Sequence, residues 1–207
     1  GSIESINTVD VGAQVSGKVT KLYVALGQQV KKGDLIAEID STTQINTLNT
    51  RKAALASYQA QFVARKTAYD VTLSNYHRLT KLYAQKGTSL DSLNSAKATL
   101  DNAKAEMNVV QENIKQAEIE VNTAETNVGY TKITSPIDGT VIATPVSEGQ
   151  TVNSNQTTPT IVKVADLSKM RIKPEISEGD ITKVKAGQEV TFSILSDSKT
   201  LYHAKIE

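Results

Sequence analysis

The fold is decided by a stretch that the chain contains twice: VSGKVTKLYVALGQQV at residues 15–30 and IDGTVIATPVSEGQTV at residues 137–152. Each residue of the second copy stands 122 positions after its counterpart, and no gap is needed to align them. Alternating Val and Ile residues are typical of half-buried strands, and glycine recurs where a turn requires a positive φ. We therefore predict two similar β units that pair into one small sandwich, with further strands at residues 35–39 and 161–164.

The segment between the two copies has a helical pattern. Residues 41–130 contain no proline and only two glycines, Gly87 and Gly129. Apolar or aromatic side chains recur every seven residues on both sides of Gly87, which is typical of a coiled coil. The two series mirror each other about position 88: residues 48, 55, 62, 69, 76 and 83 face residues 128, 121, 114, 107, 100 and 93. This predicts an antiparallel hairpin that turns at Gly87-Thr88, with arms about 60 Å long.

The ends of the two helices also have sequence signals. Ser41 and Gln44 have the spacing of a capping box, which predicts the start of the first helix. Gly87 is expected to end this helix as its C-cap glycine, and Thr88 or Ser89 to cap the second helix.

Alternation of apolar and polar residues returns near the C-terminus and predicts a third, β-rich module. We therefore expect an elongated chain of mixed α and β structure, divided into a β-sandwich in two halves at residues 9–40 and 131–166, an α-helical coiled-coil hairpin at residues 41–130, and a third module at residues 1–8 and 167–207.

Composition excludes several functions. The 207 residues include 23 basic and 22 acidic residues, so a net charge of +1 favours neither nucleic acid nor an anionic membrane. The absence of cysteine excludes disulfides and thiolate metal sites. We find no Walker motif, dinucleotide-binding glycine pattern or histidine cluster, and the two histidines, His77 and His203, lie in different modules. The sequence therefore predicts a protein that is not an enzyme, with no catalytic site, cofactor or metal.

The two β units resemble the halves of a biotinyl/lipoyl domain. The first half is carried by QVSGKV at residues 14–19 and GQQVKKGDLI at residues 27–36, the second by SPIDGTV at residues 135–141 and EGQTV at residues 148–152. In carrier enzymes of that family, a tight turn with the modified lysine joins the halves. Here the hairpin stands at that junction, so a lipoyl or biotinyl carrier is the less favoured alternative.

The order of split lipoyl halves, inserted hairpin and following β module resembles the periplasmic adaptor (membrane fusion protein) family of tripartite efflux pumps. Residues 9–17 and 149–152 are most similar to its macrolide-type members. The resemblance implies that the third module is part of a β-barrel. It implies a periplasmic subunit that assembles as a hexamer and links an inner-membrane ABC transporter to a TolC-type outer-membrane channel.

The resemblance also implies an anchor in the bacterial inner membrane for the full-length protein. No apolar run in this chain is long enough to provide that anchor, and Gly1-Ser2 resembles a remnant of cloning. Two other interpretations stay open: an adaptor of a protein-secretion or proton-driven pump, and a coiled-coil protein with a purely structural role.

Four residues match functional positions of the family. Arg78, Leu82 and Ser89 fit the Arg-x3-Leu-x6-Ser signature of the hairpin tip, which implies contact with the outer-membrane channel. Their alternative roles are solvation for Arg78, seam packing for Leu82 and helix capping for Ser89. Gln156 matches a glutamine that forms a gating ring in the channel of macrolide-type adaptors, although a polar loop is also simply a solvent-exposed loop.

Overall fold

The computed structural model describes residues 2–155, 157–177, 179, 184–194 and 197–206. The chain divides into two compact units, Thr8–Asp166 and a second unit of Gly1–Asn7 with Leu167–Glu207. Two long strands, β1 (Ser2–Gly12) and β8 (Thr160–Lys173), contribute to both units.

The larger unit contains a sandwich of two four-stranded sheets, with strand orders β1-β8-β6-β3 and β5-β4-β2-β7. The other strands are β2 (Gly17–Leu22), β3 (Gln29–Val30), β4 (Leu35–Ile39), β5 (Lys132–Thr134), β6 (Gly139–Ala143) and β7 (Thr151–Val152). β3 of the first half pairs with β6 of the second, and β7 of the second half pairs with β2 of the first. Each sheet therefore contains strands from both halves, and the predicted split sandwich is confirmed.

The internal repeat is visible in the backbone geometry. Gly27 and Gly149 have φ values of 82° and 83°, as the predicted turns require. The N–H of Gly27 donates to the carbonyl of Val141, and the N–H of Gly149 donates to the carbonyl of Val19, each at 2.8 Å. Because each bond joins one half to the other, neither half is a complete sandwich alone.

Aliphatic side chains from both halves form the core of the sandwich. The valines at equivalent repeat positions are all buried: Val19 with Val141, Val24 with Val146, and Val30 with Val152. Ile36 and Ile161 are among the largest side chains that are fully enclosed. Alternation along short strands thus places one face of each sheet inside, as the sequence predicts.

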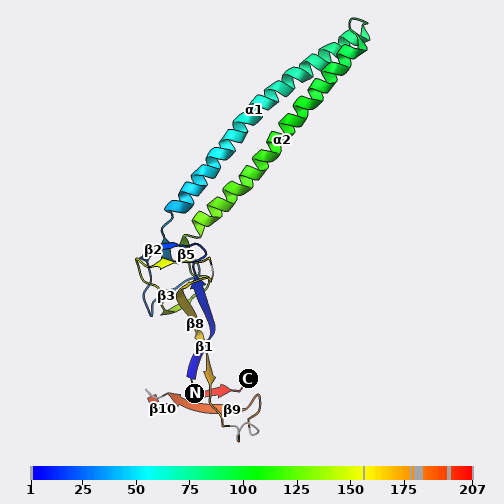
Figure 1. Ribbon diagram of the computed structural model, residues 1–207. Coiled ribbons are helices and arrows are strands. Elements are labelled where there is room, and N and C mark those ends of the chain that lie inside the picture. Colours follow the sequence, from blue (N-terminus) through cyan, green and yellow to red (C-terminus); the bar gives the residue numbers. More distant parts are fainter. Residues whose placement is uncertain (1, 156, 178, 180–183, 195–196, 207) are drawn as a thin grey trace. The chain divides into compact units, whose positions relative to one another are not determined.

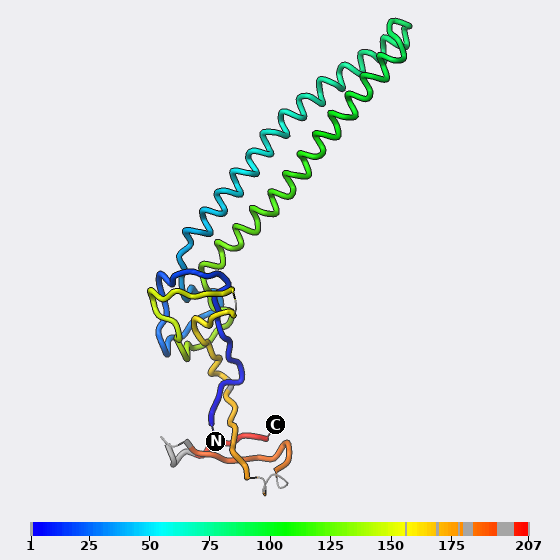
Figure 2. The backbone as a smooth tube through the Cα atoms, viewed as in Figure 1, coloured from blue at the N-terminus to red at the C-terminus, as the bar shows by residue number. Residues whose placement is uncertain are grey.

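The hairpin consists of α1 (Thr42–Ala84) and α2 (Leu90–Gly129), inserted between the neighbouring strands β4 and β5 (Figures 1 and 2). The chain reverses between residues 85 and 89, so the predicted turn at Gly87-Thr88 is confirmed.

The seam between the helices is asymmetric. Two buried residues of α2, Leu100 and Val121, belong to the predicted heptad series, and the other four, Ala96, Val110, Ala117 and Ala124, follow the same seven-residue spacing on the adjacent seam position. None of the residues of α1, all of which the structure describes, is fully buried. The seam residues Leu48, Leu55 and Phe62 of α1 are half-buried instead. Arg51 and Arg65 also form ion pairs across the seam with Glu120 at 2.8 Å and Glu106 at 2.7 Å.

The start of α1 differs from the prediction. Ser41 makes no capping hydrogen bond through its side chain, so the predicted capping box is wrong. Instead, Oδ1 of Asp40 accepts the N–H of Thr42 at 3.0 Å and the Thr42 hydroxyl at 2.6 Å. The Thr42 hydroxyl is the main cause that lowers the pKa of the Asp40 carboxyl, and the Thr42 N–H adds to it. Ser41 is still the N-cap residue, and the stronger acceptor is the carboxylate of Asp40, one position before it.

The end of α1 also differs. The left-handed residue after the C-cap is Lys86, with φ 58°, and not Gly87. The N–H of Gly87 donates to the carbonyl of Leu82 at 2.8 Å, and the N–H of Lys86 to that of Tyr83 at 2.9 Å, which is a Schellman motif. Gly87 is needed for close approach, because a Cβ there would lie 3.3 Å from the Leu82 carbonyl oxygen.

The smaller unit contains the antiparallel strands β9 (Glu189–Ile194) and β10 (Asp197–Lys205). The rings of Phe192 and Tyr202 stack across this pair with centroids 5.4 Å apart. β8 extends to Lys173, nine residues beyond the predicted strand end at residue 164.

Candidate docking tip and sandwich loops

Two of the three predicted tip residues lie on one face of α1. Arg78 and Leu82 are four residues apart, which places them one above the other near the end of the helix. The exposed Arg78 guanidinium donates from Nη2 to Oδ1 of Asn75 at 2.6 Å. Since a guanidinium carries five N–H donors, this bond orients the group and leaves donors for a partner.

Leu82 contributes to the tip in two ways. Its side chain is 38% exposed, so it provides apolar surface close to Arg78. Its carbonyl accepts the N–H of Gly87 and thereby closes the turn. A substitution of the Leu82 side chain therefore changes a surface and leaves that backbone bond in place.

Ser89 is the N-cap of α2. Its Oγ accepts the N–H of Ser92 at 3.1 Å and lies 2.9 Å from the Ser92 hydroxyl. The predicted cap at residue 88 or 89 is therefore confirmed at Ser89. The tip is also basic, since Arg78, Lys81 and Lys86 are exposed and Asp91 is the acidic residue in the first turn of α2.

The predicted gate residue Gln156 lies outside the described residues. Its neighbours on the N-terminal side are held by side chains. The N–H of Asn155 donates to Oδ1 of Asn153 at 2.9 Å, and Ser16 bonds to Asn153 and Ser154. The role of Ser16 was not predicted from the sequence. The repeat does offer a signal for it, because the equivalent residue of the second copy is Asp138, whose side chain also carries an oxygen acceptor.

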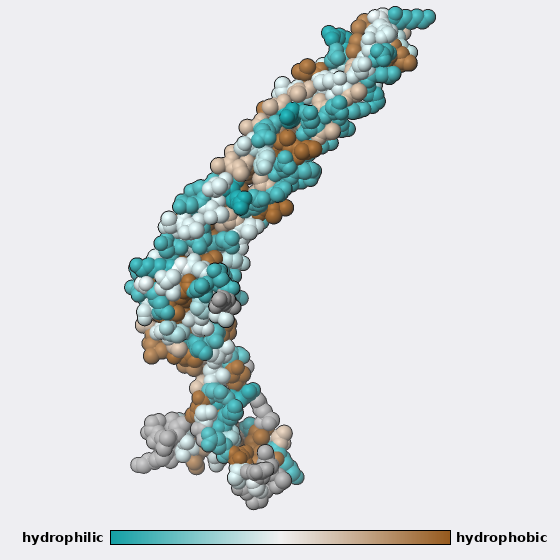
Figure 3. Space-filling model, viewed as in Figure 1, coloured by the Kyte–Doolittle hydropathy of each residue, from teal (hydrophilic) through white to brown (hydrophobic). Residues whose placement is uncertain are grey.

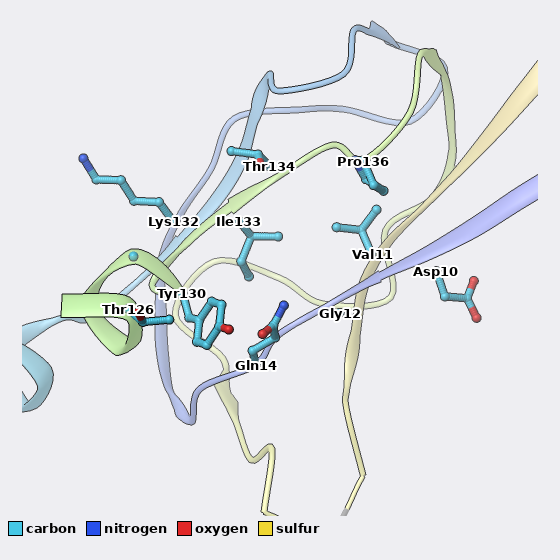
Figure 4. Close-up of a pocket in the computed structure, with 11 residues that line it drawn as sticks. Asp10, Val11, Gly12, Gln14, Thr126, Tyr130, Lys132, Ile133, Thr134 and Pro136 are labelled. Carbon is cyan, nitrogen blue, oxygen red and sulfur yellow. The ribbon is translucent and has the colours of Figure 1, made fainter. Parts of the chain in front are cut away.

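The larger unit has two hollows near the base of the hairpin. The first, about 610 Å³, lies between the edge strands β1 and β5 and the end of α2 (Figure 4). Gln14, Tyr130 and Lys132 line it. The second, about 340 Å³, lies between the helix bases and residues 154 and 155. Neither brings together a nucleophile, a base and an oxyanion donor in the way a catalytic site requires.

Two further findings concern the described part of the chain. It holds no group of three or more His, Cys, Asp or Glu side chains that could bind a metal ion. Neither of the two long helices contains an apolar window long enough to cross a bilayer.

The larger unit is thus a sandwich of two repeated halves with a helical hairpin inserted between them. A family model described as "RND MFP, barrel-sandwich hybrid domain" matches residues 7–164. The chain therefore belongs to the membrane fusion proteins, and the predicted family is confirmed.

Individual relatives agree with this assignment. The chain is 33% identical to the macrolide export protein MacA of Escherichia coli O157:H7 over 207 residues, which cover 100% of this chain and 56% of that protein. It is 34% identical to the pyoverdine export membrane fusion protein PvdR of Pseudomonas aeruginosa over 206 residues, covering 100% and 53%. The crystal structure of MacA from Actinobacillus actinomycetemcomitans superimposes with a TM-score of 0.93 at 90% identity, covering 99% of this chain and 63% of that one.

The predicted similarity to macrolide-type members is thereby confirmed. The chain spans about half the length of the curated relatives it matches.

Proposed function

We propose that this chain is the adaptor portion of a tripartite efflux pump, located in the periplasm and joined to the inner membrane in the full-length protein. It links an inner-membrane ABC transporter to a TolC-type outer-membrane channel. The observation that carries this proposal is the pair of 43- and 40-residue helices that project from the sandwich and end in a basic, partly apolar turn. Such a projection buries little surface by itself, so its length serves to reach a partner.

Assembly as a hexamer is part of the proposal. On the face of the molecule drawn in Figure 3, hydrophobic residues interrupt the polar surface of the hairpin. Val63 of α1 is 65% exposed, and Val109 and Ile119 of α2 are 61% and 68% exposed. Exposed aliphatic side chains along a helix pair support lateral packing against the hairpins of neighbouring subunits.

The chain in this proposal performs no catalysis and binds no cofactor. Conduction through the ring is passive, and the transporter hydrolyses ATP. The proposal comprises three modules: the sandwich at residues 9–40 and 131–166, the hairpin at residues 41–130, and a partial β-barrel at residues 1–8 and 167–207. A constriction formed by Gln156 stays a prediction from the family resemblance.

Contact with the outer-membrane channel is assigned to Arg78, Leu82 and Ser89. The guanidinium supplies directional donors and Leu82 an apolar anchor, a combination that is common at the energetic centres of interfaces. Because the tip is basic, we expect the end of the channel that it contacts to carry carboxylates or carbonyl oxygens. Ser89 would have to combine its capping bond with the partner contact.

The test is binding of the purified full-length adaptor to a TolC-type channel, measured by pull-down and site-specific crosslinking. Arg78→Asp is expected to abolish binding, with helicity and ring size unchanged. Lys104→Asp is the matched control, because it makes the same charge change at an exposed site on the hairpin shaft. Binding that survives Arg78→Asp, or that fails equally with Lys104→Asp, contradicts the tip assignment.

Crosslinking to the inner-membrane partner decides between an ABC transporter and the alternative of a proton-driven or protein-secretion system.

A further inference from the structure

In both halves of the sandwich, a polar residue stands directly before a glycine of the repeat. Ser16 precedes Gly17 at the start of β2, and Asp138 precedes Gly139 at the start of β6. The two positions are 122 residues apart, like all aligned pairs of the repeat. Each side chain offers an oxygen that can accept a hydrogen bond.

The two oxygens accept backbone N–H groups at equivalent positions of the repeat. Oδ1 of Asp138 accepts the N–H of Lys32 at 2.7 Å, and Oγ of Ser16 accepts the N–H of Ser154 at 2.9 Å. Lys32 and Ser154 are also 122 positions apart, and each is the second residue after a short strand, β3 or β7. One anchoring bond therefore occurs twice, and each time it ties a loop of one half to a strand start of the other.

The two loops differ in length and in how firmly they are held. The loop after β3 has four residues, 31–34, while the loop after β7 has seven, 153–159. The short loop has two backbone bonds to Ser135, from the N–H of Gly33 at 2.8 Å and to the carbonyl of Asp34 at 2.9 Å. Its anchor is a carboxylate, and bonds to ionised acceptors are shorter and stronger than bonds between neutral groups.

The first part of the long loop, residues 153–155, is bonded to Ser16, whereas its end is held separately by the N–H of Ala13, which donates to the carbonyl of Pro159 at 3.0 Å. The Ser16 hydroxyl donates to Oδ1 of Asn153 at 3.3 Å and lies 3.1 Å from the Ser154 hydroxyl, in addition to accepting the Ser154 N–H. All of these bonds involve neutral groups.

The space beneath the long loop is a polar hollow. The cavity of about 340 Å³ is lined by Ser16, Ser154 and Asn155 together with Gln44 and other uncharged residues at the hairpin base. Oε1 of Gln44 is covered and has no hydrogen-bond partner among the described residues. A polar cavity of this size is suited to ordered water. Among the described contacts, residues 153–155 are positioned by the bonds to Ser16.

We propose that Ser16 is the positioning residue of residues 153–155, and that its hydroxyl, in the place of the Asp138 carboxylate, makes this loop the more easily displaced of the two. The consequence for transport rests on the proposed function, because the loop continues into position 156, where a constriction is predicted. The anchor itself does not depend on that prediction.

Amide hydrogen exchange, read by NMR on the 207-residue chain, tests the anchor directly. Ser16→Ala is expected to speed exchange of the Ser154 amide about tenfold, with Lys32 unchanged. Asp138→Ala is the matched control from the other half, and it is expected to speed exchange of the Lys32 amide and leave Ser154 unchanged. Ser16→Asp copies the stronger anchor and is expected to slow exchange at Ser154, and Ser16→Thr, which keeps the hydroxyl, to preserve the original rate.

Unchanged exchange at Ser154 in a folded Ser16→Ala chain overturns the proposal, as does equal loosening of both loops by either variant.

A second measurement separates the anchor from the gate. Efflux by the assembled pump is expected to slow with Ser16→Asp and to be unaffected by Asp138→Ala. If exchange follows the pattern above and efflux does not respond to Ser16→Asp, the anchor stands and the predicted constriction at Gln156 is wrong.

Discussion

Gly17 and Gly139 occupy the same place in the two halves of the sandwich but face different neighbours. A Cβ added to Gly139 would lie 2.6 Å from the carbonyl oxygen of Ala165 and 2.9 Å from Cγ1 of Val164. A Cβ added to Gly17 would lie 2.6 Å from Cγ2 of Ile39, and no backbone atom comes closer than 3.5 Å. In the first case strand β8 must move away from β6, whereas in the second the buried side chain of Ile39 must shift. We therefore expect Gly139→Ala to be the more damaging of two identical substitutions.

The size of the difference follows from two opposing effects. Replacing glycine by alanine reduces the freedom of the unfolded chain, which stabilises the fold by about 0.4–1 kcal/mol at either site. Overpacking costs about 1–3 kcal/mol, and displaced backbone belongs at the upper end of that range. Gly139→Ala should therefore lower the free energy of unfolding by about 2 kcal/mol, and Gly17→Ala by less than about 1 kcal/mol.

The assay must report on the sandwich and not on the hairpin, because two such modules need not unfold together. Methyl NMR signals of Val19 and Val141, followed through a urea titration, come from the sandwich core. Circular dichroism at the helix band then gives the unfolding of the hairpin separately. If Gly17→Ala costs as much as Gly139→Ala, the contacts of the added Cβ do not determine these stabilities and the reasoning is refuted.

Three further predictions concern the hairpin. Lys86→Gly should stabilise it by about 0.5–1 kcal/mol, because glycine adopts the left-handed conformation without strain, and a thermal scan by circular dichroism that shows no gain contradicts this. The pKa of the Asp40 carboxyl is lowered by the Thr42 bonds, so its cap stabilises the folded state above the ordinary pKa of 3.8 and is lost as the pH falls through the lower folded value. Asp40→Ala should therefore reduce stability at neutral pH and make no difference in strong acid, which urea unfolding at both pH values checks. Glu106→Gln should remove the exposed ion pair with Arg65 and cost about 0.2–1 kcal/mol in low salt, with the loss shrinking in 1 M NaCl, whereas a salt-independent loss would exclude an ionic origin.

Much of the fold could be predicted because its signals are periodic or repeated. The glycines at positions 27 and 149 mark equivalent turns, and both take the positive φ that the repeat implies. The heptads predict both helices and the place where the chain reverses, since each seam residue constrains the pairing of all the others. The pairing of β3 with β6, and of β7 with β2, was not predicted. Alternation indicates which side of a strand is buried and not which strand lies beside it.

Local details at the helix ends were predicted less well, because competing residues stood next to one another. Ser41 is the N-cap residue, but the side-chain hydrogen bonds at the helix start come from the preceding Asp40 to Thr42. At the turn, glycine was expected to take the left-handed conformation, yet Lys86 does so because Gly87 is required for close approach to Leu82. The tip positions Arg78 and Leu82 come from a match to the tip signature of the family, and their contact with a channel stays a prediction.

The hairpin leaves and re-enters the sandwich through β4 and β5, which are adjacent strands paired with Ala37 opposite Ile133. The sandwich therefore requires only that the two arms begin and end side by side, whatever their length. Seven residues added to each arm would preserve the seam and lengthen the projection by about 10 Å. The reach of the projection can thus change by whole heptads while the core that carries it is left intact.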